Sequence, residues 1–244
     1  MHGIFDPLRF AVVRIPAPYC YRCPLERRRE ECGTACAARA VEILEAHADG
    51  LAGFVIEPLV QGAAGMIVQP PGYLRTIADA CRRLGILLIA DEVATGFGRT
   101  GTMFACMQEE VTPDLLCAAK GLTGGYLPVA ATLATEAVFE AFLGTHEDGC
   151  AFLHGHTYTG NPLGCAAAIA SMDLLAGFVD KLPARGAALG DMLATRVEPL
   201  AHVGEIRRRG LMVGIEGVAD RGGKAPYPAA LRMGHRVIRA ARTR

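Results

Sequence analysis

The chain has 244 residues with 25 basic and 25 acidic side chains, and 51% of its residues are hydrophobic. Such a chain can bury a sizeable core in one large domain or a domain and a half. Its balanced charge gives no sign of a nucleic acid partner. No apolar run reaches the about 18 residues that a membrane span needs, and nothing resembles a signal peptide, so we expect a cytoplasmic protein without a membrane partner.

Residues 1–36 are rich in proline and are predicted to be an irregular lead segment. This segment contains a cysteine pattern, C-x2-C-x8-C-x3-C, made of Cys20, Cys23, Cys32 and Cys36. Four thiolates can hold zinc or an iron–sulfur cluster, so a metal-binding module is one hypothesis. The spacing is not a standard zinc-ribbon pattern, and the alternative is a loop with ordinary thiols kept in a reducing compartment.

Helices and short apolar runs alternate between residues 37 and 85. The pattern predicts an amphipathic helix over 37–48, a short strand over 53–57 that ends on Glu57, and a loop after it. Pro71 and Gly72 predict the start of a second helix, which continues to Gly85. The expected apolar face of that helix consists of Tyr73, Ile77, Ala80, Cys81 and Leu84.

Two apolar runs then end on charged residues. The run 86–90 is followed by Asp91 and the run 115–119 by Lys120, and a glycine-rich turn follows each. Such runs are typical of buried strands in a parallel sheet. Because ligands of open α/β sheets bind at the carboxyl ends of the strands, we expect both side chains in one crevice. Lysine is rare in this chain: Lys181 and Lys224 are the others.

The remaining pattern predicts a strand, a short helix, a polar segment, two helices, a strand and a last helix. Their expected ranges are 129–134, 136–143, 152–161, 162–176, 184–203, 211–216 and 227–241. The order of elements up to residue 176 is typical of an α/β domain. We therefore expect the lead segment 1–36, a partial large domain over 37–176, and the start of a smaller α/β domain over 177–244.

A lysine and a carboxylate in one crevice indicate a specific chemistry. A lysine at a strand end can form a Schiff base with an aldehyde cofactor. A carboxylate beside it can hold a protonated pyridine nitrogen and so sustain an electron sink. Pyridoxal phosphate chemistry needs this pair from a protein. The alternative is a structural ion pair between Asp91 and Lys120, since such pairs are common.

The segments around the pair favour the first interpretation. DEVATGFGRTG, AAKGLTGGYLP and HGHTYTGNPLGCAAA resemble the class III, fold-type I aminotransferases, and the match covers nearly the whole chain. The resemblance implies a pyridoxal phosphate enzyme with a mostly parallel sheet flanked by helices. It also implies that Lys120 is the catalytic lysine, which binds cofactor and substrate, that Asp91 pairs with the pyridine nitrogen, and that Val93 packs on the ring.

The same resemblance implies a homodimer with shared active sites. His156 and Thr157 correspond to a segment that reaches the cofactor phosphate of the other subunit, and Gly155 to a residue that touches the substrate. A hydroxyl and free backbone N–H groups just before a helix also suit a phosphate. Taken without the resemblance, Thr157 would be an ordinary polar loop residue.

Two alanines bear on the branch of the family. Many relatives that act on ω-amino acids have a glutamate at the position of Ala63 and a glutamine at that of Ala94. Both differences favour the branch that acts in biotin synthesis. This branch implies adenosylmethionine as amino donor and 8-amino-7-oxononanoate as acceptor, and another class III ω-aminotransferase is the alternative. Glu57 ends a strand near the site without an assigned role.

Members of this family are substantially longer than 244 residues. They normally add a Gly-Ser phosphate cradle, an aromatic over the cofactor ring, and an arginine for the substrate carboxylate. We therefore expect a form truncated at both ends, which alone is not a competent aminotransferase. Two further hypotheses are a non-catalytic remnant that only pairs with a longer subunit, and the cysteine-based metal-binding module.

Overall fold

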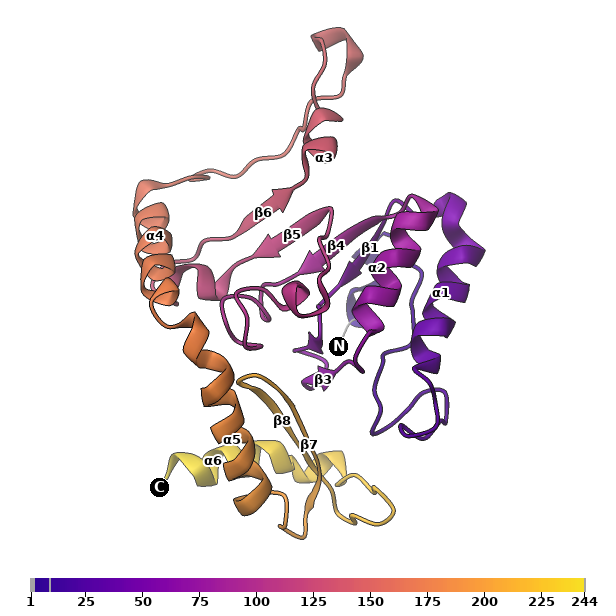
Figure 1. Cartoon of the computed structure of the whole chain (residues 1–244), viewed down its shortest axis with the longest axis vertical. Helices are drawn as coiled ribbons and strands as arrows, with labels where there is room; N and C mark the ends of the chain where they lie inside the picture. The colour runs from indigo at the N-terminus through magenta and orange to yellow at the C-terminus, as the bar shows by residue number, and fades with distance from the viewer. Residues whose placement is uncertain (1–2, 9, 244) are drawn as a thin grey trace.

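A four-stranded sheet forms the centre of the chain (Figure 1). The computed structural model describes residues 3–8 and 10–243. Strands β1 (Gly53–Ile56), β4 (Leu87–Asp91) and β5 (Leu115–Ala118) run parallel in that order, and β6 (Ala131–Ala134) is antiparallel to β5. The predicted α/β class with a mostly parallel sheet is confirmed.

Helices α1 (Ala35–His47) and α2 (Tyr73–Leu84) pack beside β1 and β4 and enclose the larger core. The Glu109 carboxylate accepts hydrogen bonds from the backbone N–H groups of Gly72 and Arg75, at 2.8 and 2.9 Å, at the start of α2. Such a carboxylate satisfies N–H groups that have no partner within the helix and complements its dipole. Gly85 ends α2 with φ 68°, a conformation that glycine adopts without strain.

The segment between β1 and α2 is more ordered than the predicted loop. Strands β2 (Val60–Gln61) and β3 (Ile67–Val68) form a small antiparallel hairpin with residues 62–66 at its tip. The Gln69 side chain fixes its base, because its amide donates to Glu57 O at 2.8 Å and accepts from Leu59 N at 3.1 Å.

Helix α4 (Pro162–Ala176) packs against the end of the sheet that carries Lys120. Asn161 caps its start by accepting a hydrogen bond from Gly164 N at 2.8 Å, and Pro162 occupies the first turn. The predicted range of this helix is confirmed. A second core lies here, formed by Phe97, Ala118, Leu122, Ala168, Leu175 and Leu182.

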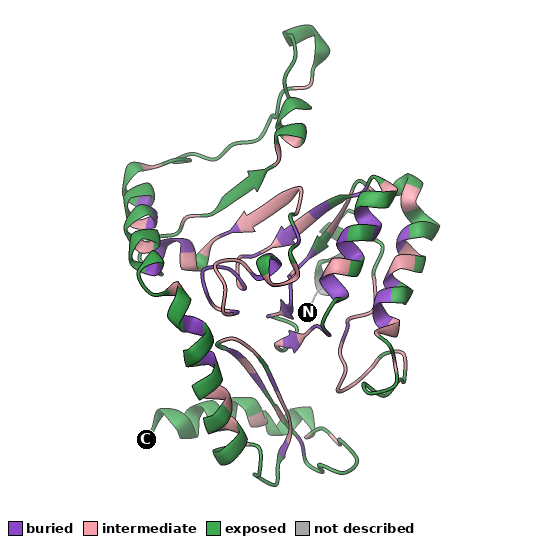
Figure 2. Cartoon of the chain, viewed as in Figure 1, coloured by how far each residue is buried: buried purple, intermediate pink, exposed green. Residues whose placement is uncertain are grey.

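Residues 135–161, here called the arm, connect β6 to α4 (Figure 1). The arm contains α3 (Glu136–Glu140) and a short 3-10 turn, η5 (His146–Asp148), and α3 is shorter than predicted. Its tip extends furthest from the other elements, and Figure 2 shows almost all of it exposed. Its two legs touch through the rings of Phe142 and Phe152, whose centroids are 5.1 Å apart.

The C-terminal part contains α5 (Leu182–Arg196), an antiparallel hairpin of β7 (Val203–Arg209) and β8 (Met212–Gly217), and α6 (Met233–Arg242). The predicted helix over 184–203 was wrong at its end, because the chain leaves the helix before Pro199 and Val203 already begins a strand. The predicted last helix begins later than expected, after Pro228. The part from residue 177 is therefore helix, hairpin, helix, and its division from the large domain stays a prediction.

The lead segment contains little regular structure within the residues that the structure describes. It begins with a short 3-10 turn, η1 (Gly3–Leu8), and no helix or strand occurs from residue 10 up to α1; residues 1, 2 and 9 lie outside the description. No single described helix is long and apolar enough to cross a membrane; by length and composition alone, α4 with the stretch 179–196 meets that test as a bent pair.

Candidate active site

Three polar residues meet at the carboxyl edge of the parallel strands. In the register of β1 and β4, Ile56 lies opposite Ala90, so Glu57 and Asp91 follow at the same level. In the register of β4 and β5, Asp91 lies opposite Cys117, and Lys120 follows shortly after it. The sheet therefore brings Glu57, Asp91 and Lys120 to one edge, where open α/β sheets bind ligands.

Asp91 is half-buried at the end of β4. Its Oδ1 accepts a hydrogen bond from the backbone N–H of Val93 at 3.1 Å. Among the described residues, the other carboxylate oxygen has no hydrogen-bond or ion-pair partner. The side chain is thus oriented by its own turn and keeps an acceptor for a ligand.

Lys120 begins a single 3-10 turn, η4 (Lys120–Thr123), with φ 48° in the left-handed region. A non-glycine residue in this region costs about 1 kcal/mol or more, and it persists only where its surroundings impose it. Here they do so from two sides. Ser171 of α4 donates to Gly121 O at 3.1 Å, and a Cβ on Gly121 would lie 2.6 Å from Phe97 Cβ.

The Lys120 side chain is exposed, and no hydrogen bond or ion pair joins it to Asp91 in the described part of the chain. The alternative of a structural Asp–Lys pair therefore receives no support. An amine without a partner and a carboxylate with an available oxygen are the groups that an aldehyde-bearing, protonated pyridine requires. The donor set of this edge fits pyridoxal phosphate.

Glu92 supports the end of β4 and was missed in the sequence. Its side chain is fully buried, accepting from the Thr95 hydroxyl at 2.5 Å and from Cys106 N at 2.9 Å. Burial, and then the nearby Glu92 carboxylate, raise the pKa of the Cys106 thiol. Because side chains alternate along a strand, two successive acids at a strand end cannot both face the same side. That alternation was the available signal for an inward carboxylate beside Asp91.

Glu57, unassigned by sequence, anchors its own loop. Its Oε2 accepts from Gly62 N at 2.8 Å, and a Cβ on Gly62 would lie 3.7 Å from Ala94 Cβ. The loop 62–66, which contains Ala63, therefore lies against the turn after β4. Small residues line this contact on both sides.

The residues predicted on the arm lie apart from this edge. Gly155, His156 and Thr157 are exposed, and Thr157 makes no hydrogen bond to any described residue. Local contacts order the segment: Thr159 Oγ1 donates to His156 O at 2.7 Å, and the rings of His154 and His156 meet edge to face at 4.8 Å. No hydrogen bond or ring contact in the described chain connects the arm with Asp91 or Lys120.

The four cysteines of the lead segment line one small hollow together with Arg27 and Arg29. All are free thiols, and burial raises the pKa values of Cys20 and Cys36. Among the described residues, no group of three or more His, Cys, Asp or Glu side chains is placed to hold a metal ion. The arrangement lends no support to a metal-binding module.

Comparison with known proteins gives one family. The family model described as aminotransferase class III matches residues 1–242. An adenosylmethionine-8-amino-7-oxononanoate aminotransferase from Nitratidesulfovibrio vulgaris is 55% identical over 245 residues, which cover 100% of this chain and 45% of the relative. The chain spans about half the length of the curated relatives it matches.

Solved structures agree on the fold. The structure of adenosylmethionine-8-amino-7-oxononanoate aminotransferase from Methanocaldococcus jannaschii is similar with a TM-score of 0.87 at 40% identity, covering 97% of this chain and 52% of that one. An (S)-enantioselective omega-transaminase from Thermomicrobium roseum gives a TM-score of 0.85 at 36% identity, covering 100% and 55%. The predicted fold-type I architecture is confirmed.

Proposed function

Because this chain belongs to the class III aminotransferases, a family that uses pyridoxal phosphate, we propose that it carries the catalytic lysine of the enzyme that forms 7,8-diaminononanoate in biotin synthesis. The amino group would pass from adenosylmethionine to 8-amino-7-oxononanoate. The turn at Lys120 is the observation that supports the proposal. The backbone of Lys120 is left-handed and the following residue is held by Phe97 and Ser171, at the sheet edge where Asp91 also lies. Its amine has no partner among the described residues.

The residues of this edge would have different tasks. Pyridoxal phosphate, when bound, supplies an electron sink for the carbon that loses its proton. The Asp91 carboxylate would hold the proton on the pyridine nitrogen, with Val93 against the ring. Lys120 Nζ would hold the cofactor and carry the proton between the two carbon positions.

The substrate pair is supported by relatives and by small residues. Several curated relatives at 42–55% identity carry the name of the adenosylmethionine-dependent enzyme. Ala63 and Ala94 stand where many relatives that act on ω-amino acids have a glutamate and a glutamine, and the loop that contains Ala63 packs on Ala94. The similarity to an omega-transaminase keeps another class III amine donor as the second candidate.

The arm supports a homodimer with shared sites. Leu153 and Tyr158 on the arm, and Leu163 in the first turn of α4, expose 94%, 82% and 74% of their surface in the single chain. Large apolar side chains exposed to this degree favour an interaction site. A second copy would cover it and bring His156, Thr157 and Gly155 to the cofactor phosphate and substrate of its partner. The nine cysteines, all free thiols, support a reducing compartment such as the cytoplasm.

Borohydride reduction with peptide mapping tests the proposal directly. The purified chain, saturated with pyridoxal phosphate, should carry the reduced label on Lys120. A label on Lys181 or Lys224 instead, or none in a folded sample with excess cofactor, rejects the assignment.

Amino-transfer assays then separate the candidates. Labelling with transfer from other amines, but not from adenosylmethionine, identifies another class III aminotransferase. A third outcome is a labelled chain that transfers no amino group alone but does so when a longer subunit is mixed in. That outcome identifies a non-catalytic partner chain.

A further inference from the structure

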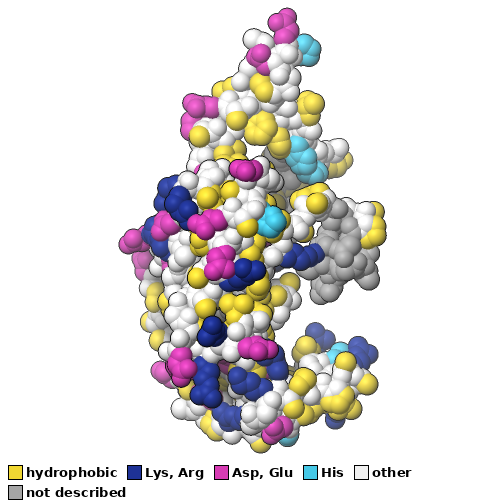
Figure 3. All heavy atoms as spheres, turned by 90° about the vertical axis from the view of Figure 1, so that its right-hand side faces the viewer, with side chains coloured by type: hydrophobic (Ala, Val, Ile, Leu, Met, Phe, Trp, Pro, Cys, Tyr) yellow, Lys and Arg dark blue, Asp and Glu magenta, His cyan; other side chains and the backbone are white. Residues whose placement is uncertain are grey.

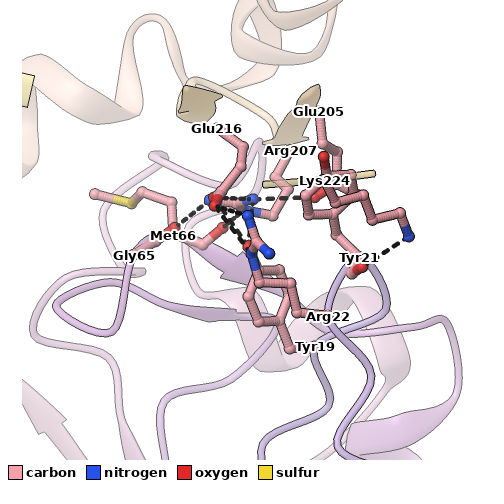
Figure 4. Close-up of polar contacts among 9 residues, drawn as sticks. All are labelled: Tyr19, Tyr21, Arg22, Gly65, Met66, Glu205, Arg207, Glu216 and Lys224. Carbon is pink, nitrogen blue, oxygen red and sulfur yellow. Dashed lines mark hydrogen bonds and ion pairs between the residues drawn. The ribbon is translucent and has the colours of Figure 1, made fainter. Parts of the chain in front are cut away.

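A buried arginine of the C-terminal hairpin contacts the active-site loop of the large domain. Arg207, on β7, is 8% exposed. Its Nε donates to Met66 O at 3.1 Å and its second terminal nitrogen to Gly65 O at 2.9 Å (Figure 4). The planar guanidinium thus makes two parallel contacts with consecutive carbonyls of the loop 62–66, a geometry that lysine cannot reproduce.

Arg207 is itself fixed by acids and by the lead segment. Its other terminal nitrogen donates to Glu216 at 2.9 Å, to Glu205 at 3.0 Å and to the Tyr19 hydroxyl at 2.9 Å. Arg22 reaches the same Glu216 carboxylate at 3.3 Å without bonding to the loop (Figure 4). A paired and fully hydrogen-bonded buried charge holds one geometry.

Glycines allow the hairpin to approach the large domain closely. A Cβ on Gly214 of β8 would lie 2.8 Å from Met66 Cβ, and a Cβ on Gly210, at the turn, would collide with the backbone of Thr100. Such distances leave no space for a side chain at either position. The hairpin therefore packs against two loops, 62–66 and 98–102.

The second loop is also tied by hydrogen bonds. Leu211 N donates to Arg99 O at 2.8 Å. Arg209 Nε donates to Gln108 Oε1 at 2.7 Å, and the Gln108 amide donates to Thr100 O at 2.9 Å. These contacts hold the glycine-rich turn that follows β4.

Both loops reach the candidate active site. The loop 62–66 packs on Ala94 and is anchored to Glu57. The loop 98–102 follows Phe97, whose ring and Cβ confine Gly121 beside Lys120. A shift of either loop would move the walls around Asp91 and Lys120.

We propose that the β7–β8 hairpin is a positioning element of the active site, in which Arg207 fixes the loop 62–66 and the turn 209–211 fixes the loop 98–102. The inference rests on the proposed function, because it assumes that this edge binds the cofactor. Arg207 contacts no reacting atom in this scheme. It acts through the loop, and loosened positioning alone can slow a reaction by about a hundredfold.

Hydrogen exchange of the cofactor-free chain tests the contact itself. The amides of Gly65 and Met66 donate to Gly62 O at 3.1 and 3.0 Å, so their exchange reports the order of the loop. In Arg207→Met these amides should exchange about tenfold faster, since local stability is lost. Arg22→Met is the matched control. It removes a guanidinium from the same Glu216 but keeps both hydrogen bonds from Arg207 to the loop, so exchange of the Gly65 and Met66 amides should not change.

A second alteration of the contact guards against misfolding of Arg207→Met. Gly214→Ala keeps every charge and should also speed exchange in the loop 62–66. Unchanged exchange in the folded variants overturns the positioning role. Cofactor affinity provides the functional readout: pyridoxal phosphate should bind about tenfold more weakly to Arg207→Met and Gly214→Ala, but not to Arg22→Met. Arg207→Lys should restore folding without restoring affinity.

The two proposals fail in different ways. Absence of a borohydride label on Lys120 in the unaltered chain rejects the proposed function. A normal label together with normal affinity in Arg207→Met and Gly214→Ala rejects the positioning role alone.

Discussion

Lys120 and Thr157 are both predicted to contact one cofactor, yet their surroundings differ. Lys120 begins a turn that Phe97 packs against and Ser171 hydrogen-bonds, and its backbone is held in a conformation that a free chain would rarely adopt. Thr157 lies on the exposed arm, without a hydrogen bond to any described residue. Contacts from distant parts of the chain fix the first position, whereas only near neighbours order the second.

The difference indicates where each half of the site is completed. At the sheet edge, β4, β5 and α4 of one chain come together, and the β7–β8 hairpin packs against the loops 62–66 and 98–102. The arm presents large apolar side chains to solvent, and Figure 3 shows apolar surface on the side of the molecule that includes the arm. In the proposed homodimer a second copy would cover these side chains, and the predictions below test that contrast.

Replacement of the lysine should have the largest effect. Lys120→Ala removes the amine, so no reduced label should form, and any amino transfer should fall by about a thousandfold or more. Fold should be retained, because the side chain is exposed and unpaired. Mass spectrometry of the reduced chain measures the label, and Lys181→Ala serves as control. Persistent labelling of the variant would contradict the assignment.

Asp91→Asn should be next in severity. The amide still accepts the Val93 hydrogen bond, so thermal stability should stay close to that of the parent chain. It cannot hold the pyridinium charge, and amino transfer should fall by about a hundredfold or more. Thermal melts of the chain, together with transfer assays of the same substitution in a full-length context, decide this. A normal rate would remove Asp91 from the site.

A pair of identical substitutions compares the two regions directly. In Gly121→Ala the new methyl group would meet Phe97, and overpacking should lower the free energy of unfolding by about 1–3 kcal/mol. In Gly155→Ala the Cβ meets nothing within 4 Å, and stability should not change. Denaturant unfolding of both variants measures the contrast. Equal losses would mean that the arm is packed in the isolated chain.

Complementation should show that the arm serves another chain. Thr157→Ala should weaken cofactor binding about tenfold, the value of one hydrogen bond to a charged group. In a mixture of Thr157→Ala with Lys120→Ala, a mixed dimer would contain one site with both residues intact. Tight cofactor binding by part of the mixture confirms sharing. Its absence in dimers shown to exchange subunits would place both residues in the same chain.

The smallest expected effect concerns the contact between the lead segment and the hairpin. Burial, and then the hydrogen bond to Glu216, raise the pKa of Tyr19 from 10.0 to about 12. Folding therefore favours the neutral phenol, and this contribution to stability is present below pH 10 and is lost as pH rises towards 12. Tyr19→Phe should lower the free energy of unfolding by about 1 kcal/mol at neutral pH. Above pH 10 the variant should lose less stability than the parent chain, because phenylalanine does not titrate. A variant that matches the parent chain at every pH would contradict the contact.

Local patterns predicted much of the sheet and its chemistry. The strands before Asp91 and Lys120 were predictable because buried parallel strands are continuous apolar runs. Pro162 after Asn161 marked the start of α4 because capping chemistry is local. By contrast, β7 was missed. Its sequence, VGEIRRR, is largely polar, and its polar side chains bond to partners far away in the sequence.

The amino-acid sequence by itself determined which reactive groups lie at the ends of the strands, a carboxylate and a lysine, and which family uses this pair. Only the tertiary structure decided how those groups are held. Arg207 bonds to Tyr19 and to the loop at Gly65, separated from it by 188 and 142 positions. The periodicity of a sequence indicates which face of an element is buried. It carries no information about partners that lie far apart in the sequence and are brought together by folding. The left-handed turn of Lys120 depends on long-range packing of the same kind, through Phe97 and Ser171.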